Sequence, residues 1–167
     1  MNPDFDYQVN AIIPIEALQQ VAYKAYAVYE PLLEPHHWET LKANLNNLES
    51  LSSLREKATL VSCSLNGKII GAAYLVPSGN PTHVYTEAQC YIRILSIDPA
   101  FSGNGIARKL TEMCIDRARS NGETEIALHT SEFMDAARHL YESAGFTKVR
   151  EIDPAFGKRY WLYQLPL

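Results

Sequence analysis

The fold of this chain is decided in its second half, by the stretch Leu95-Ser96-Ile97-Asp98-Pro99-Ala100-Phe101-Ser102-Gly103-Asn104-Gly105-Ile106-Ala107-Arg108. An apolar run of β type ends at Asp98-Pro99, and small residues then lead into the pattern of a helix over 105–120. Small side chains let a ligand approach the backbone, and the first N–H groups of a helix have no partner within it. Together with the helix dipole, these N–H groups form a site suited to phosphate.

The charges at this helix start favour an anion site. The first turn carries Arg108 and Lys109 and no acidic residue, whereas Asp or Glu normally complements a helix start that binds nothing. Two cations in that position are unfavourable unless an anion binds there. The alternative is that Gly103 and Gly105 only shape a tight turn, because a G-x-G pair alone is a weak signal.

Hydrophobic periodicity predicts the elements on either side of this stretch. Upstream, the pattern predicts an extended piece over 5–9, helices over 15–29 and 38–48, and strands over 59–65, 68–76 and 89–97. Asn66-Gly67 predicts a hairpin between the first two of these strands. Downstream, the pattern predicts a strand over 125–130, a helix over 134–143, and strands over 146–152 and 159–165. The order β-α-α-β-β-β-α-β-α-β-β indicates an α+β (mixed α/β) fold, whose mixed, twisted sheet has a parallel pair in its middle.

Length and composition restrict the classes of function. The 167 residues are expected to form one domain, 1–167, with a core of its own. The net charge of −4 excludes a general basic surface for nucleic acid or for an anionic membrane. Cys63, Cys90 and Cys114 form no C-x-x-C pair, so we expect reduced, buried cysteines. The first residues lack a signal-peptide pattern and no apolar run approaches about 18 residues, which predicts a cytoplasmic location. A monomer and a homodimer both stay open.

The glycine stretch resembles motif A of the GNAT family of N-acetyltransferases, R/Q-x-x-G-x-G/A, which follows a strand ending in an apolar-x-apolar-x-Pro pattern. Gly105 and Ala107 match the small positions, and the resemblance covers roughly residues 68–165. It implies the acyl-CoA N-acyltransferase (GNAT) fold and acetyl-CoA as cosubstrate. The residues that it assigns to acetyl-CoA are Leu95, Ser96, Ile97, Ser102, Gly103, Asn104, Gly105, Ile106, Ala107 and Arg108. Two positions depart from the family pattern: Ser102 replaces Arg or Gln, and Met134 replaces a frequent Asn.

A second stretch, Ala136–Phe146, resembles the family's motif B, in which Leu-Tyr-Glu precedes Gly-Phe. The resemblance implies that Tyr141 gives a proton to the departing thiolate, which is chemically reasonable for a phenol. The alternative is a core role, because Tyr141 lies on the apolar face of its helix. For the base that deprotonates the amine, the candidates are Glu87 and His129, and a chain of water needs neither.

The resemblance implies an N-acetyltransferase that moves the acetyl group to a small-molecule or peptide amine by direct attack. Its alternative is a non-catalytic acyl-CoA-binding module of the same fold. A dinucleotide-binding oxidoreductase is disfavoured because Arg108 stands where a third glycine is needed, and a P-loop is excluded because no Gly-Lys-Ser/Thr follows. The segments Pro31–Trp38 and Asp153–Lys158 are expected to flank the acetyl end. No metal is predicted, since His36-His37 alone is a poor ligand set.

Overall fold

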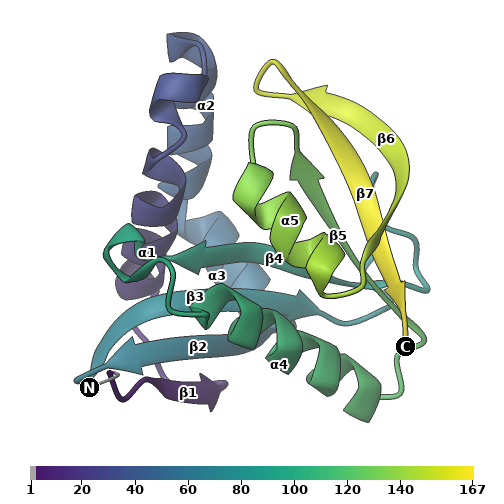
Figure 1. Ribbon diagram of the computed structural model, residues 1–167, viewed down its shortest axis with the longest axis horizontal. Coiled ribbons are helices and arrows are strands. Elements are labelled where there is room, and N and C mark those ends of the chain that lie inside the picture. The colour runs from purple at the N-terminus through teal and green to yellow at the C-terminus, as the bar shows by residue number, and fades with distance from the viewer. Residues whose placement is uncertain (1–2) are drawn as a thin grey trace.

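A seven-stranded sheet with the order β1-β2-β3-β4-β5-β7-β6 organises the chain in the computed structural model, which describes residues 3–167 (Figure 1). The strands are β1 (Asp6–Val9), β2 (Thr59–Leu65), β3 (Lys68–Val76), β4 (Cys90–Ile97), β5 (Glu125–Ser131), β6 (Thr147–Ala155) and β7 (Lys158–Pro166). The helices are α1 (Ile15–Ala27), α2 (Pro35–Leu45), α3 (Leu48–Lys57), α4 (Ile106–Ser120) and α5 (Asp135–Ser143), with 3₁₀ turns η1 (Glu30–Leu32) and η2 (Pro99–Phe101).

The sheet is mixed, and its one parallel pair among the described residues lies in the middle, as the sequence predicts. All neighbouring strands run antiparallel except β4 and β5. The parallel pairing is short, because it joins only Cys90 to Ile126 and Tyr91 to Ala127. Beyond these residues β4 stays paired to β3, and β5 stays paired to β7. The sheet therefore splits between β4 and β5 toward the carboxyl ends of both strands (Figure 1).

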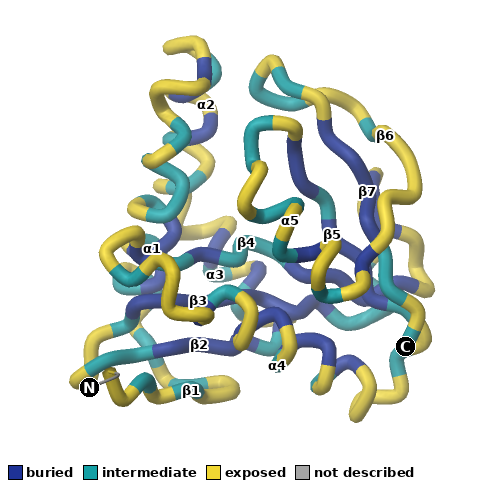
Figure 2. Tube along the Cα trace, viewed as in Figure 1, coloured by how far each residue is buried: buried dark blue, intermediate teal, exposed yellow. Residues whose placement is uncertain are grey.

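Helices cover the two faces of the sheet. On one face α4 and α5 pack against alternate strand residues such as Ile92, Ile126 and Leu128. On the other face α1 and α3 pack against the intervening residues, among them Tyr74 and Ala127. This alternation follows from the two-residue period of a strand, and Figure 2 shows the central strands as the most deeply buried part of the chain.

Two turns follow local sequence signals. Asn66 and Gly67 have φ angles of 51° and 78°, which is the left-handed backbone that a two-residue hairpin of this kind requires. The predicted hairpin between β2 and β3 is therefore confirmed. The three cysteines, Cys63, Cys90 and Cys114, are free and buried, which also agrees with the prediction.

The N-terminal half differs from the prediction of two helices, because it contains three. The second helix begins at Pro35, a residue favoured in the first turn, and ends at Leu45 rather than at 48. The chain then starts α3, whose N-cap Asn47 accepts a hydrogen bond from the Ser50 backbone N–H at 3.1 Å. Such a cap satisfies an orphan N–H and begins a new helix. Similarly, α1 ends at Ala27 rather than at 29, just before η1.

Across residues 3–167, every helix falls short of the length and apolarity that crossing a bilayer demands.

Candidate active site

A large cleft of about 1480 Å³ occupies the split between β4 and β5. Its walls come from both faces of the sheet: the start of α4 and the inner side of α5 on one face, and α1 with the loop before β4 on the other. The cleft exists because the two central strands diverge after their second pair of residues. A long ligand can thus enter on one face and present its end on the other.

The turn between β4 and α4 is held by Asp98. Its backbone N–H donates to the Ile70 carbonyl at 2.8 Å, and its carboxylate accepts from the Ala100 N–H at 3.0 Å. The same carboxylate pairs with Lys24 of α1 at 3.4 Å. These contacts fix the direction in which the chain enters the helix, and so they fix where the first turn of α4 points.

The start of α4 is open and free of acidic side chains. Gly105 is the N-cap residue with a φ of 76°, and Gly103 has a φ of 81°. No heavy atom lies within 4 Å of the position where a Cβ would stand on either glycine. The chain therefore leaves open space around both glycines at the helix start, where Arg108 and Lys109 belong to the first turn. This arrangement fits a phosphate-bearing ligand such as coenzyme A.

An irregularity in β4 exposes backbone to the same cleft. Between the pairs Arg93–Tyr74 and Ser96–Ala72, β4 has one residue more than β3, and Ile94 takes a φ of 48°. Such a bulge leaves one residue out of the regular ladder and re-aims its neighbours. Leu95 therefore lies at a point where the strand offers backbone groups toward the gap rather than toward β3.

The structure brings most of the predicted acetyl-CoA residues to the cleft. Those that line it are Leu95, Ile97, Ser102, Gly103, Gly105, Ile106, Ala107 and Arg108. Two do not line it. Ser96 is buried and donates from its hydroxyl to the Ile94 carbonyl at 3.3 Å, and Asn104 is exposed and donates to the Phe101 carbonyl at 2.9 Å. Both side chains thus support the turn and the bulge.

Arg108 joins the two helices on this face, since its guanidinium donates to the Ser143 hydroxyl at 2.8 Å. Ser143 is the last residue of α5. Met134, which replaces the frequent Asn of the family, lines the cleft at the start of α5 and accepts from the Thr130 hydroxyl at 3.5 Å. A thioether sulfur is only a weak acceptor, so this position offers the ligand little polar contact.

Tyr141 lines the cleft from α5 and is buried. Its ring packs edge-on against Phe146, with ring centroids 6.0 Å apart. Burial raises the pKa of the Tyr141 phenol well above its usual value. The hydroxyl is therefore protonated and able to donate at any ordinary pH.

His129 lines the cleft from β5, on the face of the sheet opposite Tyr141. Its Nδ1 lies 2.5 Å from the hydroxyl oxygen of Tyr85, whose ring stacks on Tyr91 with centroids 3.9 Å apart. Burial lowers the pKa of His129 to about 4, with smaller contributions from the charges of Arg93 and His83. The imidazole is thus neutral near pH 7.

The third predicted catalytic residue does not join this group. Glu87 is exposed in the turn before β4 and does not line the cleft, and its backbone carbonyl accepts from Gly79 at 2.8 Å. The turn places Glu87 at the closed end of the β4–β5 pair, whereas the cleft opens at the other end. Neighbouring Gln89 is buried and hydrogen-bonded to Glu125. Of the two candidate bases, only His129 is within the site.

Arg93 and Tyr85 are cleft residues that the sequence reasoning missed. Arg93 is the one charged residue of β4, and this interruption of an apolar strand was the signal that could have identified it. Tyr85 precedes the strand in an irregular loop, where no periodicity marks a side chain as inward-facing. Only the fold brings Tyr85 against His129.

The rim of the cleft is formed differently from the expectation. No residue of 31–38 lines the cleft. Tyr26 of α1 and Tyr29, just before η1, do so instead. From the predicted segment Asp153–Lys158, Asp153 and Ala155 at the end of β6 and Phe156 in the β6–β7 turn line the cleft. This turn rests on α2, because a Cβ on Gly157 would meet the His37 ring at 2.8 Å.

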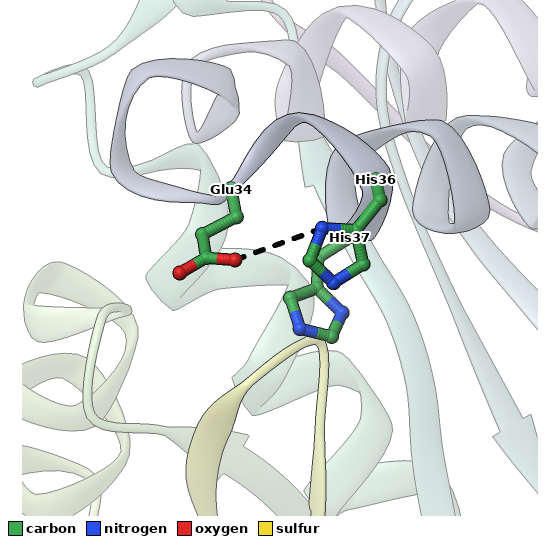
Figure 3. A group of neighbouring side chains, drawn as sticks. All are labelled: Glu34, His36 and His37. Carbon is green, nitrogen blue, oxygen red and sulfur yellow. Dashed lines mark ion pairs between the residues drawn. The ribbon is translucent and has the colours of Figure 1, made fainter.

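A group of potential metal ligands lies on the outer side of this rim, at the start of α2 (Figure 3). Glu34, His36 and His37 have ligand atoms within 4.8 Å of one another, and the Glu34 carboxylate lies 3.6 Å from His36 Nδ1. The structure thus adds a third ligand that the sequence analysis did not consider. The positive end of the helix dipole opposes a cation there, and we assign no metal to this group.

A mixed sheet that splits beside an open helix start defines a class of α/β protein suited to a long ligand with an anionic end. Residues 17–146 match the model of the acetyltransferase (GNAT) family. The chain therefore belongs to the GNAT acetyltransferase family.

Known relatives and structures agree with this assignment. N-alpha-acetyltransferase 30 of Schizosaccharomyces pombe is 34% identical over 87 residues, which cover 52% of this chain and 56% of that protein. Human N-acetyltransferase 8B is 35% identical over 82 residues, which cover 49% of this chain and 35% of that protein. The chain thus spans from about a third to just over half of these relatives. The PaiA N-acetyltransferase of Thermoplasma acidophilum in complex with coenzyme A has the same fold, with a TM-score of 0.77 at 13% identity, covering 97% of this chain and 99% of that chain.

Proposed function

We propose that this protein transfers the acetyl group of acetyl-CoA directly to an amine, in the cleft between β4 and β5. The observation that carries this proposal is that one continuous cleft connects the open start of α4 on one face of the sheet to His129 on the other. Membership of the GNAT family, relatives named N-acetyltransferases and a structural neighbour in complex with coenzyme A support it.

The residues of this chain divide the binding of acetyl-CoA between a helix and a strand. The first N–H groups of α4, with Arg108, hold the pyrophosphate, and the split edge of β4 around Leu95 pairs with the pantetheine arm. When bound, acetyl-CoA supplies an activated thioester: the amine nitrogen bonds to the acetyl carbon as the carbon–sulfur bond breaks, and the proton that the amine loses balances the proton that the thiol gains. Holding both reactants in one cleft provides much of the rate.

His129 helps to remove the proton of the amine. If its Nδ1–H donates to the Tyr85 oxygen, the lone pair of Nε2 is left free to accept. Because the pKa of His129 is about 4, the imidazole does not retain the proton at neutral pH. It orients a water molecule that passes the proton to solvent.

Tyr141 acts at the other end of the reaction, where the sulfur departs. Its raised pKa makes complete loss of the phenolic proton costly, so its main contribution is a hydrogen bond donated to the developing thiolate. Such a donor in a site that excludes water stabilises charge more strongly than it would in water.

Release of free coenzyme A in the presence of acetyl-CoA and a panel of amines tests the proposal. We expect turnover with at least one class of amine, and none in a variant that lacks the helix-start site. Tight binding of acetyl-CoA with no release across the panel would instead support the non-catalytic module. A binding module has no need of the polar pair formed by His129 and Tyr85 beyond the coenzyme site.

A further inference from the structure

Arg93 lies on the face of the sheet where the acceptor amine is expected. In the β3–β4 ladder it pairs directly with Tyr74, and directly paired residues project to the same face. Tyr74 packs with α1 and α3, and Arg93 therefore lies on that face. Ile92, the residue before Arg93 in β4, packs with α4 on the opposite face. The Arg93 side chain therefore points away from the helix start that suits the pyrophosphate, and the coenzyme's phosphates do not neutralise it.

The ionisable groups whose pKa values respond to the charge of Arg93 are tyrosines and a histidine, and none of them is a carboxylate. That charge lowers the pKa values of Tyr26, Tyr85, Tyr91 and His129, each of which is otherwise shifted mainly by burial. These groups come from α1, β4, β5 and the loop before β4, so Arg93 stands among the elements that enclose this end of the cleft.

Arg93 has no ion pair and no hydrogen-bond partner among the described residues. Three carboxylates line the cleft, Glu49, Glu151 and Asp153, and none of them pairs with Arg93. Glu151 is instead held by Arg159 at 2.9 Å. Another cleft arginine, Arg150, donates to the Val84 carbonyl at 3.4 Å. The Arg93 guanidinium therefore has no partner within the described residues, and it is available to pair with an anionic group of a ligand in the cleft.

We propose that Arg93 binds the carboxylate of the acceptor, and that the acceptor is a free amino acid. This inference rests on the proposed transferase function and specifies its substrate class. An amine that lacks an anionic group would bring its ammonium beside Arg93 and be repelled. An amino acid enters as a zwitterion, pairs its carboxylate with the guanidinium, and then loses only the proton of its amine. Arg93 also suits this role chemically, because its planar fork matches a carboxylate.

Paired acceptors test the proposal. Coenzyme A release is measured with free amino acids and with the corresponding amino-acid amides, for example leucine and leucinamide, alanine and alaninamide. The amide keeps the side chain, and its amine is less basic and more easily deprotonated. On amine reactivity alone, the amide would therefore be the better acceptor. We expect kcat/KM to favour the free acid by at least about tenfold in the wild type, because one charge-assisted pair is about this strong.

Variants assign the preference to Arg93. Arg93→Gln should bring the acid-to-amide ratio close to one, and Arg93→Lys should retain part of it. Arg150→Gln is the matched control, since it removes another cleft arginine and should keep the wild-type ratio. Acetyl-CoA affinity and the unfolding temperature of each variant verify folding. If Arg93→Gln does not fold, a reduced acid-to-amide ratio in Arg93→Lys supports the role of Arg93, and an unchanged ratio contradicts it.

The outcomes separate the two proposals. If the amides are turned over as well as or better than the free acids, the role of Arg93 is overturned and the transferase function stands. The same holds if the preference for the acid survives in Arg93→Gln. Turnover of peptides with a free N-terminus but not of amino acids also overturns the role of Arg93. If no amine of any kind is acetylated, the transferase function fails, and the substrate class fails with it.

Discussion

At the scale of single residues, the Tyr141 hydroxyl is the clearest test of chemistry. We predict that Tyr141→Phe lowers kcat by about 10- to 100-fold while acetyl-CoA affinity stays close to the wild type. The reason is that the ring remains packed against Phe146 and only the donor is lost. Steady-state coenzyme A release and isothermal titration with acetyl-CoA measure the two quantities.

Tyr74 supplies the matched control for this variant. Its hydroxyl is buried without a hydrogen-bond partner, and the residue does not line the cleft. Tyr74→Phe should therefore keep full activity and leave the free energy of unfolding unchanged or raised by about 1 kcal/mol. Wild-type turnover in Tyr141→Phe would remove that hydroxyl from the mechanism.

His129 gives a pH dependence whose sign is fixed by its low pKa. The folded protein binds this proton with a pKa of about 4, whereas an unfolded chain binds it near 6.5. Between these values the unfolded state holds more protons, so stability falls as the pH drops from about 6.5 to about 4. We predict that the unfolding temperature of His129→Gln falls less steeply over this pH range than that of the wild type, by about 2–4 °C per pH unit. Parallel slopes in wild type and variant, followed by calorimetry, would contradict the assignment.

Sequence places a candidate residue well where its own element carries a pattern. Tyr141, indicated by the resemblance to motif B, and His129, on the strand predicted over 125–130, both line the cleft, and their catalytic roles stay predictions. Arg93 and Tyr85 were not identified, because their roles depend on which face of β4 lies beneath α1 and on a loop that returns to β5. Glu87 was wrongly expected within the site, since proximity in sequence to a strand does not say at which end the sheet splits.

At the scale of elements, the first turn of α4 should behave as an anion site. We predict that Gly105→Glu weakens acetyl-CoA binding at least about 100-fold, because a carboxylate would occupy the phosphate position and meet the coenzyme's charge. Gly105 also has a φ of 76°, which costs about 1–2 kcal/mol for any residue with a Cβ.

Gly79→Glu separates charge and position from backbone strain. Gly79 has a comparable φ of 89° in the loop after β3 and does not line the cleft. The Gly79→Glu variant should lose about as much stability as Gly105→Glu and keep the wild-type affinity for acetyl-CoA. Equal affinity losses in the two variants, measured by titration calorimetry, would show that strain rather than the anion site explains the effect.

Element prediction succeeded where caps and periodicity agree, and failed where they compete. The hairpin at Asn66-Gly67 and helix α4 carry their own start and stop signals. The region 35–57 does not, because α2 and α3 have similar apolar spacing and only Asn46-Asn47 separates them. The side chain of Asn47 caps a separate helix, α3, at a point where periodicity predicts only the end of the helix over 38–48.

At the scale of the whole molecule, the cleft is enclosed by a contact between segments far apart in sequence. The β6–β7 turn rests on α2 through Gly157, with no room for a Cβ beside His37. We predict that Gly157→Ala raises the KM for the amine several-fold and lowers the free energy of unfolding by about 1–3 kcal/mol, with acetyl-CoA affinity retained.

Gly67→Ala is the control for this variant, since Gly67 has a similar φ of 78° and open space around it. It should lose stability through strain alone and keep the wild-type KM. A Gly157→Ala protein with unchanged KM would mean that this contact does not shape the acceptor entrance. No sequence pattern predicts the contact, because it depends on how two distant elements are brought together.

Because β4 and β5 pair over only two residues each, the rest of each strand has an unpaired edge inside the sheet. Every second peptide group along Ile92–Ile97 lacks a neighbouring strand on that side, so its amide hydrogen is held less firmly than its depth suggests. Deuterium uptake should be faster along this inner seam than in β2 or β3. Slower deuterium uptake in Ile92–Ile97 on addition of coenzyme A would indicate that the ligand forms hydrogen bonds with this free strand edge, as a neighbouring strand would.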